Sequence, residues 1–115
     1  MKLSCHCRNI ELIVSNKPTQ LTECNCSICR RYAALWGYYT PKEVEVTINR
    51  QPPLEYTQDE GALTVKICSQ CGCVCHYETL KEITPAKVGI NFRMAENIEE
   101  LKDIDVRSFD GANLL

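Results

Sequence analysis

The residues best suited to chemistry lie in one short stretch, Cys24-Asn25-Cys26-Ser27-Ile28-Cys29-Arg30-Arg31. Its C-x-C-x2-C spacing lets three sulfur atoms approach one point while the backbone turns. Because Zn²⁺ accepts thiolates in tetrahedral geometry at about 2.3 Å, the stretch predicts a zinc site with three local ligands. The fourth position is filled either by a distant residue, which makes a closed structural site, or by water or substrate, which makes an open site that can do chemistry. We call Cys24, Cys26 and Cys29 the three-cysteine site.

The arginines that follow the third cysteine extend this chemistry. Zinc lowers the pKa of a bound thiol enough to deprotonate it, and a thiolate held in this way is a nucleophile at neutral pH. A guanidinium group binds carboxylates, so Arg30 or Arg31 is a candidate to hold the carboxylate of an anionic thiol substrate. The alternative is that both arginines form a solvated helix end, where cations are favoured.

Two separated cysteine pairs predict a second metal site. Cys5 and Cys7 form a C-x-C pair near the start, and Cys68 and Cys71 form a C-x2-C pair followed by Gly72. Together they offer four thiolates, the usual closed zinc site, and we call them the four-cysteine site. A structural zinc of this type contributes roughly 10–16 kcal/mol of apparent binding free energy, comparable to the whole stability of a small domain. The alternative is a reduced cluster without metal.

The sequence offers several candidates for the fourth ligand of the three-cysteine site, namely two further cysteines and the two histidines. Cys73 and Cys75 lie two residues apart on an expected strand, and we favour small buried hydrophobic residues over ligands for both. Either of them, or His6 or His76, is also a candidate to close the three-cysteine site. His76 is otherwise expected at the surface.

Composition excludes several classes of protein. The chain has 115 residues, nine of them cysteine, and a net charge of −2. The odd cysteine count, the tight pairs and the lack of a signal peptide argue against a secreted disulfide scaffold and favour a cytoplasmic metal protein. The acidic balance argues against nucleic acid as a partner, and the lack of a long apolar run argues against a membrane. We expect one zinc-binding domain over residues 1–115.

Short strands and frequent turns are expected to position these cysteines. Alternation of apolar and polar residues is typical of half-buried strands, and it favours a mainly β sandwich or open barrel. Ser27 is expected to cap a short helix that runs to about Arg31, and residues 96–102 to hold one helical turn. Strands are expected around residues 10–14, 33–40, 44–48, 63–67, 73–77 and 88–93, a turn at residues 59–61, and a polar loop at residues 106–111.

Taken together, the motifs resemble a known family. The matching segments are Cys5-His6-Cys7, Cys24 to Arg31, Cys68-Ser69-Gln70-Cys71-Gly72, Asn91-Phe92-Arg93 and Phe109-Asp110-Gly111. In this order they resemble the glutathione-dependent formaldehyde-activating enzyme family, which also contains the centromere protein V group. The resemblance covers almost the whole chain and implies a zinc-stabilised β-sheet fold of the β-tent type, with at most one or two short helices.

The resemblance also implies an activity. Two zinc ions per chain are expected, with Cys5, Cys7, Cys68 and Cys71 as structural ligands and Cys24, Cys26 and Cys29 as the catalytic ligands. The implied reaction is that of a carbon–sulfur lyase of the S-(hydroxymethyl)glutathione synthase type, which reversibly joins formaldehyde and glutathione. The competing hypothesis is a non-catalytic, zinc-stabilised module that binds a protein partner and has both zinc sites closed.

Three residues depart from the family pattern: Arg8, and Cys73 and Cys75, which the pattern does not require. Arg8 stands where the family usually has glycine after Cys-His-Cys. Because positive φ angles are unfavourable for residues with a Cβ atom, we expect Arg8 to avoid them.

Overall fold

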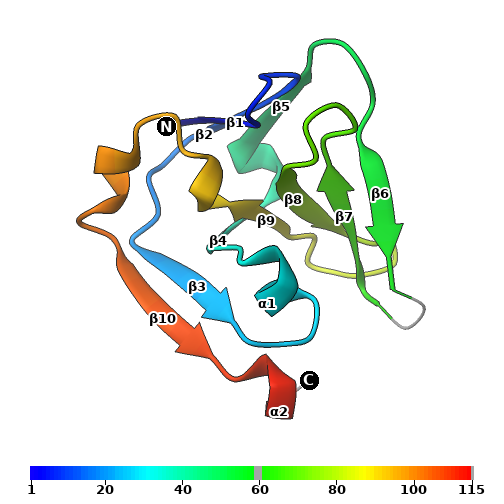
Figure 1. Cartoon of the computed structure of the whole chain (residues 1–115). Helices are drawn as coiled ribbons and strands as arrows, with labels where there is room; N and C mark the ends of the chain where they lie inside the picture. Colours follow the sequence, from blue (N-terminus) through cyan, green and yellow to red (C-terminus); the bar gives the residue numbers. More distant parts are fainter. Residues whose placement is uncertain (59–60, 115) are drawn as a thin grey trace.

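Two β-sheets dominate the computed structural model, which describes residues 1–58 and 61–114 (Figure 1). The three-stranded sheet has the order β1-β2-β5, with β1 at Lys2–Ser4, β2 at Ile10–Val14 and β5 at Val44–Ile48. The seven-stranded sheet has the order β10-β3-β4-β9-β8-β7-β6. Its strands are β3 (Gln20–Cys24), β4 (Trp36–Tyr39), β6 (Leu54–Thr57), β7 (Leu63–Ile67), β8 (Val74–Thr79), β9 (Val88–Asn91) and β10 (Asp105–Phe109).

The helices are short, which confirms the predicted mainly β fold. The α-helices in the described ranges are α1 (Cys29–Tyr32) and α2 (Gly111–Leu114), and the 3-10 helices are η1 (Pro41–Glu43), η2 (Phe92–Met94) and η3 (Ile98–Leu101). The helical turn expected within residues 96–102 is η3. The predicted cap is wrong, because Ile28 occupies the N-cap position of α1 and no side chain caps it. None of these helices is long and apolar enough to cross a membrane.

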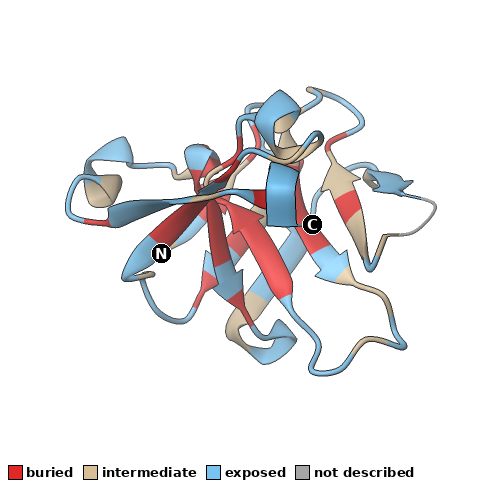
Figure 2. Ribbon diagram, turned by 90° about the horizontal axis from the view of Figure 1, so that it is seen from below, coloured by how far each residue is buried: buried red, intermediate tan, exposed pale blue. Residues whose placement is uncertain are grey.

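Alternation along the strands builds the core. In β2, Ile10, Leu12 and Val14 are buried while Ile13 is exposed, as expected for a strand with one face on the core. The main cluster joins these side chains to others from both sheets, including the fully buried Ile90. Figure 2 shows the buried residues gathered along the central strands. A smaller cluster of Ala34, Trp36, Val65 and Tyr77 packs separately.

The C-terminal segment differs from its prediction as a polar loop. Residues 105–109 form β10, which runs parallel to β3 in a register from Asp105 opposite Gln20 to Phe109 opposite Cys24. All other strand pairs in the described residues are antiparallel. The prediction failed because β10 is almost entirely exposed and gains its conformation from backbone bonds to β3, so it has no apolar alternation. As a result Phe109 lies beside Cys24.

Two further predictions concern His76 and the turn at residues 59–61. His76 was expected at the surface, but it is 2% exposed, and its Nε2 lies 3.5 Å from Glu78 Oε1. Its place on β8, between β7 and β9, accounts for the burial. The turn expected at residues 59–61 falls on residues 59 and 60, which lie outside the described residues.

Arg8 has a φ angle of 64°, so the prediction that it avoids positive values is wrong. The surrounding hydrogen bonds fix this conformation. The Arg8 N–H donates to the carbonyl oxygen of Cys5 over 3.0 Å, and Asn49 Nδ2 donates to the Arg8 carbonyl oxygen over 2.9 Å. The left-handed conformation costs a residue with a Cβ atom about 1–2 kcal/mol, a cost that the turn around the cysteines imposes.

This strain predicts how two variants at position 8 compare. Arg8→Gly and Arg8→Ala both lose the ion pair with Glu96, but only the glycine variant loses the Cβ atom. We expect Arg8→Gly to have a free energy of unfolding about 1 kcal/mol higher than Arg8→Ala. Denaturant unfolding of the zinc-loaded proteins measures the difference. Equal stability of the two variants would mean that the left-handed conformation carries no cost here.

Candidate metal centres

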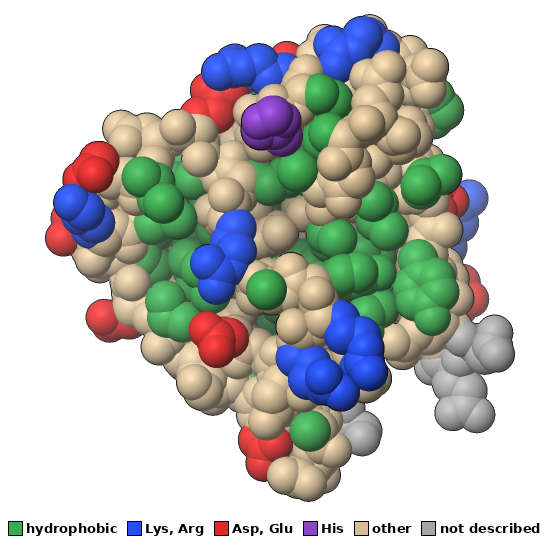
Figure 3. Space-filling model, viewed as in Figure 1, with side chains coloured by type: hydrophobic (Ala, Val, Ile, Leu, Met, Phe, Trp, Pro, Cys, Tyr) green, Lys and Arg blue, Asp and Glu red, His purple; other side chains and the backbone are tan. Residues whose placement is uncertain are grey.

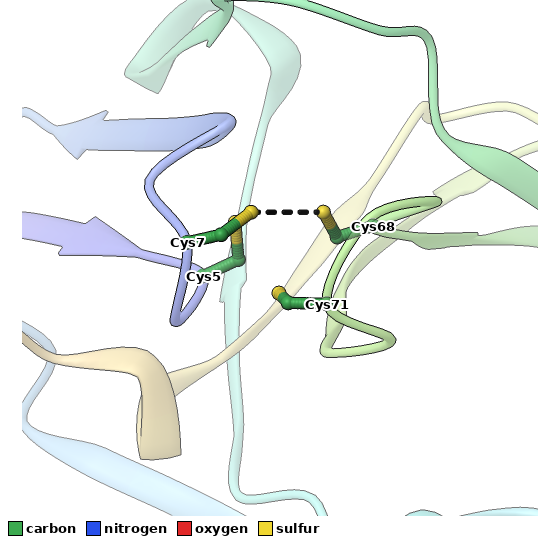
Figure 4. Close-up of side chains that lie close together, drawn as sticks. All are labelled: Cys5, Cys7, Cys68 and Cys71. Atoms are coloured by element: carbon green, nitrogen blue, oxygen red, sulfur yellow. Dashed lines mark hydrogen bonds between the residues drawn. The ribbon is translucent and has the colours of Figure 1, made fainter.

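The four-cysteine site lies where the two sheets meet. Cys5 and Cys7 belong to the loop between β1 and β2, and Cys68 and Cys71 belong to the loop between β7 and β8. Figure 4 shows the two pairs of side chains pointing toward one another across this junction. Gly72 follows with φ of 79°, a left-handed value that glycine adopts without strain and that lets the chain turn back beneath the sulfur atoms.

The sulfur positions fit a tetrahedral metal. All four Sγ atoms lie within 4.8 Å of one another, with Cys5 3.7 Å from Cys7 and Cys7 3.6 Å from Cys68. Tetrahedral zinc with bonds of about 2.3 Å would place its thiolates about 3.8 Å apart. Backbone N–H groups also donate to these sulfurs, from Ile10 to Cys5 over 3.3 Å and from Gln70 to Cys68 over 3.4 Å. The donor set is therefore compatible with zinc.

Burial and backbone donors act in opposite directions on these thiols. Burial raises the pKa of Cys5 to about 12 despite the N–H of Ile10. Burial would also raise the pKa of Cys71, but the N–H groups of Cys73 and Cys7 lower it to about 6. Donors directed at sulfur favour the ionised form that a metal requires.

The three-cysteine site forms at the end of β3. Cys24 is the last residue of the strand, Cys29 is the first residue of α1, and Cys26 lies in the intervening loop. Their Sγ atoms lie within 4.8 Å of one another, so this set is also compatible with a metal ion. The Cys26 N–H donates to Cys24 Sγ over 3.5 Å, and the Cys29 N–H donates to Cys26 Sγ over 3.4 Å.

The electrostatic environments of two of these thiols differ. Burial raises the pKa of Cys29 to about 12, although the neighbouring Trp36 side chain opposes the rise. For Cys26, the side chain and backbone of Cys29 outweigh burial and lower the pKa.

No fourth His, Cys, Asp or Glu side chain joins this set within the part of the chain that the structure describes. The candidates for closing the site lie elsewhere. Cys75 is fully buried in the main core cluster, and Cys73 packs against the same cluster, as expected for small hydrophobic residues. His6 is exposed, and His76 is buried beside Glu78.

Two pockets share Cys24 and Cys29 among their lining residues. The polar pocket has a volume of about 410 Å³, and the aromatic pocket has a volume of about 540 Å³. Figure 3 shows hydrophobic side chains gathered beside α1, on its β6–β7 side. The polar pocket carries charges of both signs, from Glu23, Arg30, Arg93 and Asp110. The aromatic pocket includes Tyr32, Trp36, Tyr38, Tyr77 and Phe109, with Lys87 and Arg107.

The two arginines singled out from the sequence have different positions. Arg30 lines the polar pocket, whereas Arg31 donates from its guanidinium to the carbonyl oxygen of Ser27 over 2.7 Å and lines neither pocket. Sequence reasoning missed Arg93 and Arg107. Arg93 follows the Asn91-Phe92 segment noted above, which was the available signal, whereas Arg107 depends on the unexpected strand β10.

The segment after β10 also shapes the polar pocket. Asn25 Nδ2 donates to Asp110 Oδ1 over 3.0 Å, and the Ala112 N–H donates to Asn25 Oδ1 over 2.9 Å. These contacts fasten the loop of the three-cysteine site to the start of α2. Hydrogen bonds from Asn113 and Asn25 lower the pKa of Asp110, so its carboxylate is ionised at neutral pH.

Comparison with known proteins agrees with the order of the motifs. The sequence profile of the glutathione-dependent formaldehyde-activating enzyme family matches residues 1–107. A crystal structure of a Rhodobacter sphaeroides protein is similar to this fold, with a TM-score of 0.73 and 23% sequence identity. The match covers 93% of this chain and 100% of that protein. A search of curated proteins found no match.

The two cysteine sites predict different consequences of losing one ligand. Cys68→Ser and Cys26→Ser should each remove about one of two zinc equivalents per chain. We expect Cys68→Ser to lower the free energy of unfolding by about 4 kcal/mol or more, because the four-cysteine site joins the two sheets. Cys26→Ser should cost far less, since the ligands of its site all lie within residues 24–29. Elemental analysis and thermal unfolding check both, and equal destabilisation would contradict the assignment.

Proposed function

Because the chain belongs to the glutathione-dependent formaldehyde-activating enzyme family, we propose that it is a carbon–sulfur lyase that reversibly adds glutathione or a similar thiol to formaldehyde or a related aldehyde. The main support for this proposal is the three-cysteine site, which offers three sulfur ligands and borders two pockets. Cys24, Cys26 and Cys29 would hold the catalytic zinc, and Cys5, Cys7, Cys68 and Cys71 the structural zinc.

The zinc at the three-cysteine site would supply acidity, lowering the pKa of an incoming thiol so that it reacts as a thiolate at neutral pH. In the addition, the thiol loses its proton and its sulfur forms a bond to the carbonyl carbon. The π electron pair of the carbonyl group moves to oxygen, which then takes up a proton. The product is a hemithioacetal, and no oxidant or reductant is consumed.

The polar pocket is suited to the charged groups of a peptide thiol. Arg30 and Arg93 offer guanidinium groups to carboxylates, while Glu23 and Asp110 offer carboxylates to an ammonium group. Arg93 Nε already donates to the carbonyl oxygen of Ala33, which fixes the side chain beside α1. A thiol held in this pocket would have its sulfur close to the three cysteines. The aldehyde would then react with a bound and oriented thiol rather than with one met by chance in solution.

The non-catalytic alternative requires a different coordination at the three-cysteine site. A protein-binding module needs a closed second zinc and no response to thiols. The three-ligand count among the described residues favours the enzyme over this module. Free thiol ligands also require a reducing compartment, so we place the protein in the cytoplasm. With a net charge of −2, nucleic acid is not proposed as a partner.

Exchange spectroscopy tests the activity directly. In two-dimensional NMR of glutathione and formaldehyde at equilibrium, the zinc-loaded protein should accelerate exchange with S-(hydroxymethyl)glutathione above the spontaneous rate. Cys29→Ser should abolish the acceleration, and Cys73→Ala should keep it, because Cys73 lies outside both cysteine sites. Spontaneous exchange rates with both zinc sites loaded would refute the proposed reaction.

The neighbouring arginines provide a matched pair for substrate binding. Arg30→Gln should raise the KM for glutathione about five-fold, because it removes a cation from the polar pocket at a site open to water. Arg31→Gln should change KM by less than about two-fold, since the Arg31 guanidinium donates to the carbonyl oxygen of Ser27 and Arg31 lines neither pocket. Initial rates at varied glutathione measure both. Equal effects of the two substitutions would remove Arg30 from the binding site.

A further inference from the structure

The aromatic pocket offers apolar walls to a ligand much larger than formaldehyde. Its volume of about 540 Å³ lies in the range of small-molecule sites. The rings of Tyr32, Tyr38 and Phe109 in its lining are at least partly exposed, as are the aliphatic side chains of Ile28 and Leu63. Hydrophobic side chains gather beside α1 on the β6–β7 side (Figure 3). These walls suit a ligand with a planar, apolar part.

Two cations line the aromatic pocket without a carboxylate to oppose them. Lys87 and Arg107 belong to its lining, which includes no Asp or Glu among the described residues. Neither cation forms an ion pair with a carboxylate that the structure describes. The polar pocket differs, because Glu23 and Asp110 accompany its arginines. Zn²⁺ with three thiolates would carry one negative charge, which the two cations outweigh, so the aromatic pocket favours an anion.

Contacts with neutral side chains position both cations and leave their charge available. Lys87 Nζ lies over the ring of Tyr38, 4.5 Å from its centroid. Arg107 Nε donates to Thr22 Oγ1 over 3.0 Å, and the terminal nitrogens of the guanidinium make no hydrogen bond with the described residues. Burial raises the pKa of Tyr38, while the Thr22 side chain and the charge of Arg107 lower it. Both cations therefore act on the part of the pocket that contains Tyr38, and both keep N–H donors for an anion.

We propose that the aromatic pocket binds an aromatic carboxylate, with the ring against its apolar walls and the carboxylate at Lys87 and Arg107. Cys24, Cys26 and Cys29 line the same pocket, so a ligand held there borders the three-cysteine site. An aldehyde that carries both an aromatic ring and a carboxylate is therefore the substrate class that the pocket suits. The thiol sulfur would bond to the aldehyde carbon, the carbonyl oxygen would take up a proton in place of the one that the thiol loses, and the carboxylate would stay unchanged. Turnover of such an aldehyde rests on the proposed function, but binding of the carboxylate does not.

Matched unreactive ligands test the site. Benzoate and benzamide have nearly the same shape but only benzoate is charged, and acetate has the carboxylate without the ring. We expect the zinc-loaded protein to bind benzoate about five-fold or more tightly than either of the other two. NMR titration at constant ionic strength measures each Kd. No binding of benzoate, or equal affinity for benzoate and benzamide, would overturn the inference. Equal affinity for benzoate and acetate would do the same, because it indicates a carboxylate that only coordinates zinc.

Substitutions locate the carboxylate. Lys87→Gln and Arg107→Gln should each weaken benzoate binding about two- to five-fold, and an NMR spectrum like that of the wild type away from the substitution shows that each variant folds. Lys42→Gln removes the same charge outside the pocket, and Arg30→Gln removes a cation from the polar pocket, so neither should weaken benzoate binding. Equal weakening by all four substitutions would indicate a general effect of charge and contradict the inference. Weakening by Arg30→Gln alone would contradict it too, because the carboxylate would then lie in the polar pocket.

Turnover separates this inference from the proposed function. 4-Formylbenzoate is an aromatic aldehyde with a carboxylate, and benzaldehyde is its neutral counterpart. Greater acceleration of glutathione exchange with 4-formylbenzoate than with benzaldehyde, each relative to its spontaneous rate, supports both. Acceleration with formaldehyde but not with 4-formylbenzoate leaves the proposed function standing and overturns the substrate class. Acceleration with no aldehyde, together with tighter binding of benzoate than of benzamide, refutes the proposed function and supports the carboxylate site.

Discussion

The junction of four cysteine side chains is the contact on which the arrangement of the two sheets depends. Cys5 and Cys7 come from the loop after β1, Cys68 and Cys71 come from the loop after β7, and their sulfur atoms converge within 4.8 Å. A chain of 115 residues has a modest core, so a tetrahedral metal at this junction would supply a large share of its stability. The same junction fixes β7 and β8, which carry two walls of the aromatic pocket, Val65 and Tyr77.

Local spacing made much of the molecule predictable. Thiols two or three residues apart can converge on a common point in a tight turn, so the local motifs alone indicated both clusters. Alternation likewise predicted β2 and β7, because each has one face on the core. The two separated pairs, Cys5 with Cys7 and Cys68 with Cys71, also predicted a set of four thiolates, and the structure places these four sulfur atoms within 4.8 Å of one another.

Features set by distant contacts could not be found in this way. Nothing near residue 107 indicates that β10 will run parallel to β3, and only that register places Arg107 and Phe109 at the aromatic pocket. His76 is buried by the strands on both sides of β8, although its own segment is rich in polar residues. The positive φ of Arg8 follows from hydrogen bonds to Cys5 and to Asn49, a residue 41 positions away.

Two clusters with the same ligand chemistry are assigned different roles because the chain surrounds them differently. In the four-cysteine site, Cys5 and Cys68 are almost fully buried, and the ligands come from the β1–β2 loop of one sheet and the β7–β8 loop of the other. In the three-cysteine site, every ligand comes from the single short segment 24–29, and Cys24 and Cys29 line pockets with contrasting walls. A buried set of four thiolates leaves an ion no free position and suits a structural role. A set of three beside two pockets would leave an ion with a position that a small thiol could take. Access and ligand number, rather than the identity of the donor atoms, therefore distinguish the site to which the proposed function assigns the chemistry.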